Sequence, residues 1–302
     1  MSPIHPLAGV YAATLTPLNQ DFSICPDAVL PFLSFLAARG CHGALLFGTT
    51  GEGPSFAINE RAEILRAALE IRHTHPGFHL LAGTGTPSLE ETIQLTRIAF
   101  ELGFDGALTL PPYYFRQATD EGLFAWFDQV IRRAVPAGAS LLGYHFPAQA
   151  GIGLSLDLLA RLKDAHPHKF AGMKDSSGDA DYASAVGERF GADFIILTGS
   201  DRLFLHGLKH HAGGAITALS NLYSPLLRQV WDAFEQGEEA NETQEKLAAI
   251  NKVLAHYTPY PSILKALLAR QHGMELGPAR PPLTPISAQA IDACLEELLT
   301  IL

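Results

Sequence analysis

The sequence is poor in positive charge, in cysteine and in long apolar runs. Of its 302 residues, 21 are lysine or arginine and 31 are aspartate or glutamate, which gives a formal net charge of −10 at pH 7. An acidic balance of this size argues against nucleic acid or an anionic membrane as the main partner. The three cysteines, Cys25, Cys41 and Cys294, form no CxxC pair, so we expect neither a disulfide framework nor a zinc site.

No stretch approaches the ~20 apolar residues that a membrane span needs. The opening MSPIHPLAGVYAATLTP has no basic region and no unbroken apolar core, so it does not read as a secretory signal. We therefore expect a cytoplasmic protein with no membrane partner. Apolar residues make up 47% of the chain and charged ones 17%, which is typical of a compact fold with a large core.

Short apolar runs alternate along the chain with longer stretches of helical period. Most runs are too short for a buried helix and are bounded by Gly, Pro, Ser or Thr, which favours strands. The runs are residues 10–15, 43–47, 79–82, 106–110, 140–144, 170–173, 194–197 and 214–217. Eight parallel β–α units in about 220 residues predict a closed (β/α)8 barrel, or TIM barrel. A doubly wound open sheet is the second possibility, although no GxGxxG follows the first run.

Helical periodicity continues to the end of the chain, where no further strand is expected. The clearest helical stretches are residues 28–38, 89–102, 243–256, 263–271 and 288–299. Ser88 with Glu91 three residues later is typical of a capping box, and Ser155 opens another helix. We predict a barrel over residues 1–234 and a helical region over 235–302 packed on it.

A lysine directly follows the sixth run, in the stretch AGMKDSSGD. Active sites of such barrels lie at the carboxyl ends of the strands, so Lys174 stands where chemistry is expected. Burial disfavours an ammonium ion, and a free amine there can form a Schiff base with a ketone. Alternatively, its stem packs on the rim and its ammonium reaches water or Asp175. The other six lysines look ordinary, one in a loop and five in helical patterns: Lys169, and Lys163, Lys209, Lys246, Lys252 and Lys265.

Polar residues follow other runs at the same rim. Tyr144 is a candidate proton shuttle, with Thr49 and Tyr114 as relay partners, or simply a rim tyrosine with a hydrogen-bonded hydroxyl. The GTTGEG loop, residues 48–53, offers backbone N–H groups and the Thr49 and Thr50 hydroxyls to a carboxylate, or is only a glycine turn. No histidine pattern indicates a catalytic metal. We expect no metal and no cofactor beyond a covalent imine on Lys174.

Four motifs occur together in the chain. They are Gly48-Thr49-Thr50-Gly51-Glu52, Pro112-Tyr113-Tyr114, Tyr144-His145-Phe146-Pro147 and Gly172-Met173-Lys174-Asp175. With these motifs the sequence resembles the dihydrodipicolinate synthase / N-acetylneuraminate lyase family over almost its whole length. The resemblance implies a (β/α)8 barrel and Schiff-base chemistry on pyruvate, in which Lys174 forms the imine, Tyr144 transfers the proton, and Thr49 and Thr50 hold the carboxylate. It also implies a homo-oligomer, a dimer of dimers (homotetramer), in which Tyr114 reaches into a neighbour's site.

Two departures from the family pattern bear on the substrate. Dihydrodipicolinate synthases carry an arginine where this chain has Gln149, and sialic acid lyases carry an acidic residue where it has Arg202. We therefore predict a class I aldolase that splits a 4-hydroxy-2-oxo acid, 2-keto-3-deoxygluconate-like or 4-hydroxy-2-oxoglutarate-like, into pyruvate and an aldehyde. The alternatives are dihydrodipicolinate synthase, which condenses pyruvate with aspartate semialdehyde, and a non-catalytic oxo-acid-binding regulator. The candidate substrate-binding residues are Gly48, Thr49, Thr50, Gln149, Ser176, Ser200, Asp201, Ile216 and Thr217.

Overall fold

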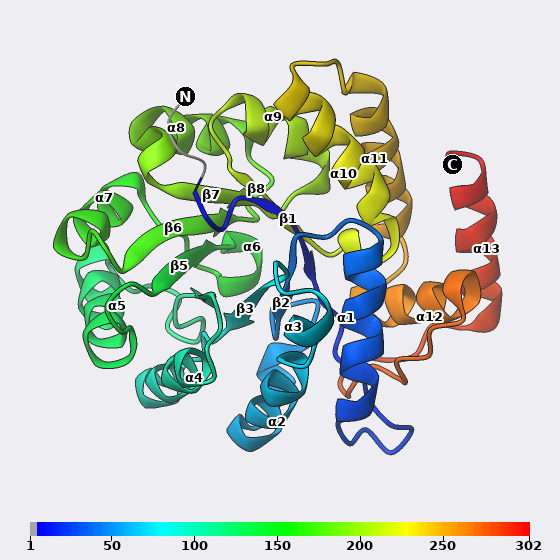
Figure 1. The fold of residues 1–302 in the computed structure, drawn as a ribbon, viewed down its shortest axis with the longest axis horizontal. Helices are drawn as coiled ribbons and strands as arrows, with labels where there is room; N and C mark the ends of the chain where they lie inside the picture. Colours follow the sequence, from blue (N-terminus) through cyan, green and yellow to red (C-terminus); the bar gives the residue numbers. More distant parts are fainter. Residues whose placement is uncertain (1–4) are drawn as a thin grey trace. The chain divides into compact units, whose positions relative to one another are not determined.

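Eight strands form a closed barrel in which spatial order follows chain order (Figure 1). The structure is a computed structural model and describes residues 5–302. The strands are β1 (Gly9–Ala13), β2 (Gly43–Leu46), β3 (His79–Gly83), β4 (Gly106–Thr109), β5 (Ser140–His145), β6 (Phe170–Asp175), β7 (Ile195–Thr198) and β8 (Gly214–Thr217). The closed parallel barrel confirms the predicted (β/α)8 fold and not the doubly wound sheet.

Helices follow the strands, and no strand occurs after β8 in the described chain. The longer helices are α1 (Val29–Ala38), α2 (Ile58–Ala68), α4 (Leu89–Glu101), α5 (Asp120–Ala134), α7 (Leu156–Ala165), α8 (Ala180–Phe190), α10 (Ser220–Gln236), α11 (Asn241–Leu254), α12 (Tyr260–His272) and α13 (Ala288–Leu299). Short helices are α3 (Ile71–Thr74), α6 (Pro147–Ala150), α9 (Phe204–Lys209) and the 3₁₀ turns η1 (Pro26–Ala28), η2 (Gly53–Ser55), η3 (Gly191–Asp193) and η4 (Asp201–Leu203). The expected helical tail is therefore present, with α13 at the predicted residues.

Side-chain caps account for where several helices begin. The Ser88 hydroxyl accepts from the Glu91 N–H at 3.3 Å, as the sequence predicted, and Ser155 accepts from Leu158 at 3.0 Å. Such caps satisfy N–H groups that the first turn of a helix leaves without a backbone partner. They therefore fix where the chain turns from loop to helix.

By compactness the chain divides into two parts, each described separately below. The first, the β3–β8 part, comprises residues 5–9 and His79–Ile216. Its core joins the outward faces of the strands to α5, α7 and α8, with Phe127, Leu158 and Phe170 buried in one apolar cluster. Burial of such side chains, worth about 1.5–3 kcal/mol each, is the main force that holds these helices on the strands. Figure 1 shows α5 and α7, in green, side by side.

The second, the β1–β2 part, comprises Val10–Phe78 and Thr217–Leu302. Here α10 packs on α1, α11 and α12, and α13 packs on α11 and α12. A buried asparagine ties α10 to the end of β1, because Asn221 Nδ2 donates to Ala13 O at 2.8 Å and its Oδ1 accepts from Leu15 N at 3.3 Å. The predicted boundary between residues 234 and 235 remains a prediction.

Candidate active site

The side chains of Lys174 and Tyr144 meet in the interior of the barrel. Tyr144 on β5 and Lys174 on β6 are register partners. Met173, the neighbour of Lys174, packs in the apolar cluster on the helix side, so strand alternation turns Lys174 to the opposite, inward face. Lys174 is 4% exposed and Tyr144 5%, and the lysine Nζ lies 4.4 Å from the centroid of the tyrosine ring. The predicted pair is thus brought together in a buried setting.

Both strands run one or two residues further than their apolar runs suggested. β5 ends at His145 and β6 at Asp175, because backbone pairing continues through Asp175, which pairs with His145 on one side and Thr198 on the other. Lys174 is therefore a strand residue and not the first residue of a loop. Its backbone position is fixed by strands on both sides.

Ser176 and Gly199 complete the immediate surroundings of Lys174. The Ser176 hydroxyl donates to Tyr144 Oη at 3.5 Å, a long hydrogen bond. Gly199, just after β7, donates its N–H to Asp175 O at 2.6 Å. A β-carbon at Gly199 would lie 2.8 Å from Lys174 Cε and closer still to Ser176 Oγ, so a larger residue there would displace these two side chains. The sequence analysis missed Gly199, although it lies in the TGSD segment that follows the seventh run.

On the outer face of the same two strands, buried polar groups alternate with the site residues. Burial raises the pKa of the Asp175 carboxyl, and its oxygen accepts from Ser177 N–H at 2.9 Å. Burial lowers the pKa of His145 to about 4, so the ring is neutral at pH 7 and its Nδ1 accepts from Leu154 N–H at 2.8 Å. Tyr182 stacks on His145 with ring centroids 4.0 Å apart. These contacts fix the ends of β5 and β6 on the face that is turned toward the helices.

The other predicted residues of the β3–β8 part differ widely in exposure. Tyr114, in the loop after β4, is 75% exposed and makes an edge contact with the equally accessible Phe115 at 5.3 Å between ring centroids. Gln149 is exposed on α6. Ser200 is half-buried, and its N–H donates to Thr198 Oγ1 at 3.3 Å. The remaining two predicted residues, Asp201 and Ile216, are buried.

An arginine lies against the end of the short helix that carries Gln149. The helix that carries Gln149 ends at Gly151, whose φ of 69° is left-handed. A β-carbon there would lie 2.8 Å from Cγ and 2.9 Å from Nε of Arg116. The stem of Arg116 therefore crosses the end of α6, and within residues 5–302 its guanidinium makes no hydrogen bond or ion pair. The sequence analysis did not single out Arg116.

The GTTGEG loop belongs to the β1–β2 part and is a tight turn. Glu52 N–H donates to Thr49 O and Gly53 N–H to Gly48 O, each at 3.1 Å. Gly51 packs so closely that a β-carbon would lie 2.7 Å from the carbonyl oxygen of Thr14. Thr50 is 9% exposed, and neither its hydroxyl nor that of Thr49 hydrogen-bonds to another described residue. Thr217, in the same part, instead shares a 2.8 Å hydrogen bond with Ser220.

One prediction about the lysines is wrong. Lys265, which the helical pattern made look ordinary, is 4% exposed, and its Nζ lies 3.0 Å from Oε1 of Glu52 in the GTTGEG loop. Burial lowers the pKa of Lys265, while the Glu52 carboxylate acts in the opposite direction. The chain thus holds a second buried lysine, and its partner is known from the structure.

The sequence profile of the Dihydrodipicolinate synthetase family matches residues 6–301. The chain belongs to this family. An uncharacterised DapA-like lyase of Chloroflexus aurantiacus is 38% identical over 94% of each chain. A 4-hydroxy-tetrahydrodipicolinate synthase of Synechococcus elongatus is 32% identical over 97% of each. The solved 4-hydroxy-tetrahydrodipicolinate synthase of Methylacidiphilum fumariolicum SolV superposes with a TM-score of 0.88 at 28% identity, covering 98% of this chain and 97% of that one.

Members of the Dihydrodipicolinate synthetase family are lyases and aldolases that use a lysine Schiff base with pyruvate. The resemblance derived from the four sequence motifs is therefore confirmed at the level of the family. Among residues 5–302, no group of three or more His, Cys, Asp or Glu side chains is arranged to hold a metal ion. No helix in that range is both long and apolar enough to cross a membrane.

Proposed function

We propose that this protein is a class I, metal-independent aldolase that releases pyruvate and an aldehyde from a 4-hydroxy-2-oxo acid, 2-keto-3-deoxygluconate-like or 4-hydroxy-2-oxoglutarate-like. The observation that carries the proposal is the buried Lys174 amine over the ring of Tyr144. A desolvated amine is a better nucleophile than an ammonium ion in water, and the adjacent phenol supplies a proton donor and acceptor.

The reaction proceeds through an imine. The Lys174 amine adds to the C2 carbonyl of the oxo acid, and loss of water leaves an iminium ion. The C3–C4 bond then breaks: its electron pair moves into the iminium to give an enamine, while the C4 hydroxyl loses its proton and departs as an aldehyde. Protonation at C3 and addition of water release pyruvate and restore the amine.

Proton transfers and substrate binding fall to the other motif residues. We assign the transfers at the nitrogen and at the C4 hydroxyl to Tyr144, with Ser176 as its hydrogen-bond partner. Thr49 and Thr50, with their unpaired hydroxyls, take the carboxylate of the oxo acid. Tyr114 acts in an assembled homo-oligomer, a dimer of dimers, in the cytoplasm.

Borohydride reduction in the presence of pyruvate, followed by peptide mapping, tests the assignment. We expect the reduced adduct on Lys174 and none in a Lys174→Ala variant. Lys209→Ala, which removes an exposed lysine of α9, is the matched control and should label like the wild type. An adduct on another lysine, or full activity of Lys174→Ala, contradicts the proposal. Labelling without turnover of any oxo acid fits the oxo-acid-binding regulator instead.

A second candidate is 4-hydroxy-tetrahydrodipicolinate synthase, the name carried by several relatives. Gln149 speaks against it, because a neutral amide cannot supply the charged bidentate contact that an arginine gives a carboxylate. Arg116 speaks for it, because its unpaired guanidinium lies against Gly151, two residues from Gln149. Efficient condensation of pyruvate with aspartate semialdehyde, lost in Arg116→Ala, would favour the synthase. Cleavage of 4-hydroxy-2-oxo acids without that condensation would favour the aldolase.

A further inference from the structure

The carboxylate of Glu52 is buried, with an ion pair at one oxygen and a hydrogen bond at the other. Its side chain is 0% exposed. Oε1 lies 3.0 Å from Nζ of Lys265 on α12, and Oε2 accepts the backbone N–H of Arg280 at 2.6 Å. Lys265 in turn donates to Pro278 O at 2.8 Å. One side chain of the GTTGEG loop is therefore fixed to two segments that lie more than two hundred residues further along the chain.

Glu52 also has an unfavourable backbone conformation. Its φ of 56° and ψ of 28° are left-handed, a region that residues with a β-carbon rarely adopt. The turn needs this conformation, since it lets the N–H of the next residue, Gly53, reach back to Gly48 O at 3.1 Å. Such a conformation persists only where surrounding contacts enforce it. The two contacts on the Glu52 carboxylate are of that kind.

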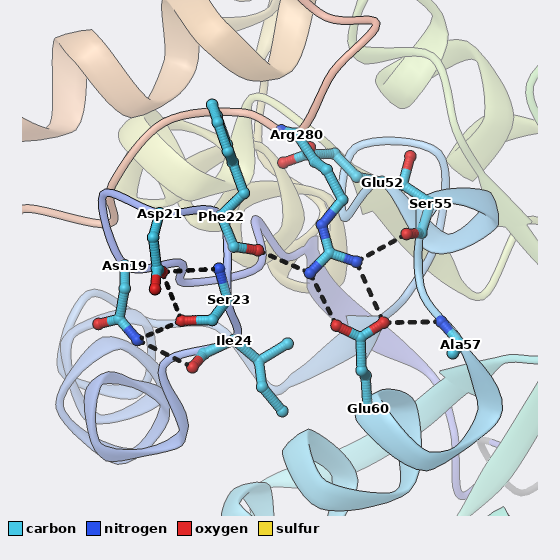
Figure 2. Close-up of polar contacts among 10 residues, drawn as sticks. All are labelled: Asn19, Asp21, Phe22, Ser23, Ile24, Glu52, Ser55, Ala57, Glu60 and Arg280. Carbon is cyan, nitrogen blue, oxygen red and sulfur yellow. Dashed lines mark hydrogen bonds and ion pairs between the residues drawn. The ribbon is translucent and has the colours of Figure 1, made fainter.

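Arg280 extends the fixed region to the start of α2. Its guanidinium donates to both oxygens of Glu60, at 2.8 and 3.1 Å, and to the carbonyl oxygens of Ser55 and Phe22, each at 2.7 Å (Figure 2). Glu60 in turn accepts the Ala57 N–H at 2.9 Å. The Arg280 hydrogen bond is the main cause that lowers the pKa of Glu60. The chain on the C-terminal side of the GTTGEG loop is thus held by the same arginine.

A buried ion pair is a poor source of stability compared with an apolar pair of the same size, but it specifies one arrangement sharply, because an unpaired buried charge is strongly disfavoured. The Glu52 carboxylate is enclosed by its partners and is not available to a ligand. Its effect on a reaction must therefore be indirect, through the position of Thr49 and Thr50, three and two residues earlier.

We propose that Lys265 is a positioning residue that acts through Glu52: together with the Arg280 backbone, it fixes the GTTGEG turn in the conformation in which Thr49 and Thr50 bind the carboxylate of the oxo acid. This inference rests on the proposed function. It makes α12 and the segment before α13 determinants of affinity for pyruvate, although none of their residues belongs to the substrate-binding set proposed above.

The test uses pyruvate and borohydride, so no aldehyde partner has to be known. The double variant Glu52→Gln/Lys265→Met removes both buried charges and leaves an amide oxygen for the Arg280 N–H. We expect the pyruvate concentration for half-maximal trapping to rise about tenfold, with the maximal rate of trapping within about threefold of wild type. Lys246→Met is the matched control, because it breaks an exposed Lys–Glu pair on α11, 3.1 Å in length, and should change neither quantity.

A merely structural role predicts a different result. In that case a double variant that melts at the wild-type temperature also binds pyruvate like the wild type, and this outcome overturns the positioning role while leaving the proposed function intact. If the double variant does not fold, Lys265→Arg, which keeps the charge but not the fit, is measured with the same expectation and the same contrary outcome. Absence of trapping in the wild type overturns the proposed function, and the inference with it.

Discussion

Lys174 on β6 sits over the ring of its register partner Tyr144 on β5, with Nζ 4.4 Å from the ring centroid. The pairing is a consequence of parallel strands, in which register partners project to the same face. Because the amine lies over the ring face, the phenol oxygen remains directed toward Ser176. The proposed nucleophile and the proposed proton donor thus share one wall of the barrel without hydrogen-bonding to each other.

Tyr144→Phe removes the hydroxyl and keeps the ring, so it tests the role of the hydroxyl alone. The ring still lies under Lys174, so we expect the fold and the imine to survive, with kcat lower by about two to four orders of magnitude, the usual worth of a general acid–base. Steady-state cleavage and the rate of pyruvate trapping measure the effect. Tyr182→Phe is the control: it loses a 2.6 Å hydrogen bond to Leu154 O on the outer face and should keep its turnover. Turnover of Tyr144→Phe at the wild-type rate would remove Tyr144 from the mechanism.

Gly199→Ala should displace the side chain of Lys174, although Lys174 itself is not substituted. The added methyl would lie 2.8 Å from Lys174 Cε, so either the lysine or the β7 loop must shift. We expect kcat/KM to fall at least about tenfold, because small misplacements of a reacting group are costly. Gly77→Ala, where nothing lies within 4 Å of the new carbon, is the control. Equal kinetics in the two variants would contradict the close approach.

Acid should destabilise the protein through His145. Burial lowers its pKa from 6.5 to about 4, so between these values the unfolded chain binds a proton that the native ring does not. Stability is therefore full above pH 6.5 and falls as the pH approaches 4. At about 1.4 kcal/mol per pKa unit, the loss is on the order of 3 kcal/mol.

Chemical denaturation of the wild type and of His145→Gln across pH 4 to 6.5 checks this expectation, and the variant should lose less stability on acidification. Asp175 acts in the opposite sense, since burial raises its carboxyl pKa and a proton on it favours the native state. Because Asp175 is present in both proteins, the difference between their curves isolates His145. Parallel curves would show that the imidazole does not govern the acid response.

Tyr114 and Phe115 are the largest exposed aromatic pair described, at 75% and 69% exposure. Exposed apolar side chains of this size favour contact with another chain. We expect the protein to sediment as a homo-oligomer, and Tyr114→Ala to lower kcat by about tenfold or more if the tyrosine completes a neighbour's site. Sedimentation velocity and kinetics on the same samples measure both effects, with Leu299→Ala on α13, a side chain that is 73% exposed, as the control. A monomer with full activity would contradict the prediction.

The sequence alone was enough to predict the barrel and the closeness of Lys174 and Tyr144, and the reason is physical. Strands buried on both faces give short continuous apolar runs, and chemistry in such barrels collects where those runs end. That Lys174 and Tyr144 lie together at one end of the barrel could therefore be predicted from their positions, while their catalytic roles remain proposals. The ends of β5 and β6 could not, because backbone pairing continues through the polar residues Lys174, Asp175 and His145 after the apolar signal stops.

Lys265 and Gly199 show what a single sequence hides. Lys265 lies among Ile263, Leu264 and Leu267 in a pattern that fits an ordinary amphipathic helix, and its burial is decided by Glu52, far away in the chain. Gly199 reads as one more loop glycine until the Lys174 side chain is placed against it. Both roles arise from tertiary contacts, which periodicity along the chain does not encode.

Because side chains alternate along a strand, the register of β6 against β5 decides whether Lys174 or Asp175 faces the interior of the barrel. In the observed alignment an amine faces the lumen and the carboxyl of Asp175 faces the helices. A shift of one position would reverse them, so that the carboxyl of Asp175 faced the lumen and the amino group of Lys174 lay among the apolar side chains of the helices. The packing of Met173 in the apolar core therefore also selects the register that places Lys174 beside Tyr144, the two residues to which the proposed reaction is assigned.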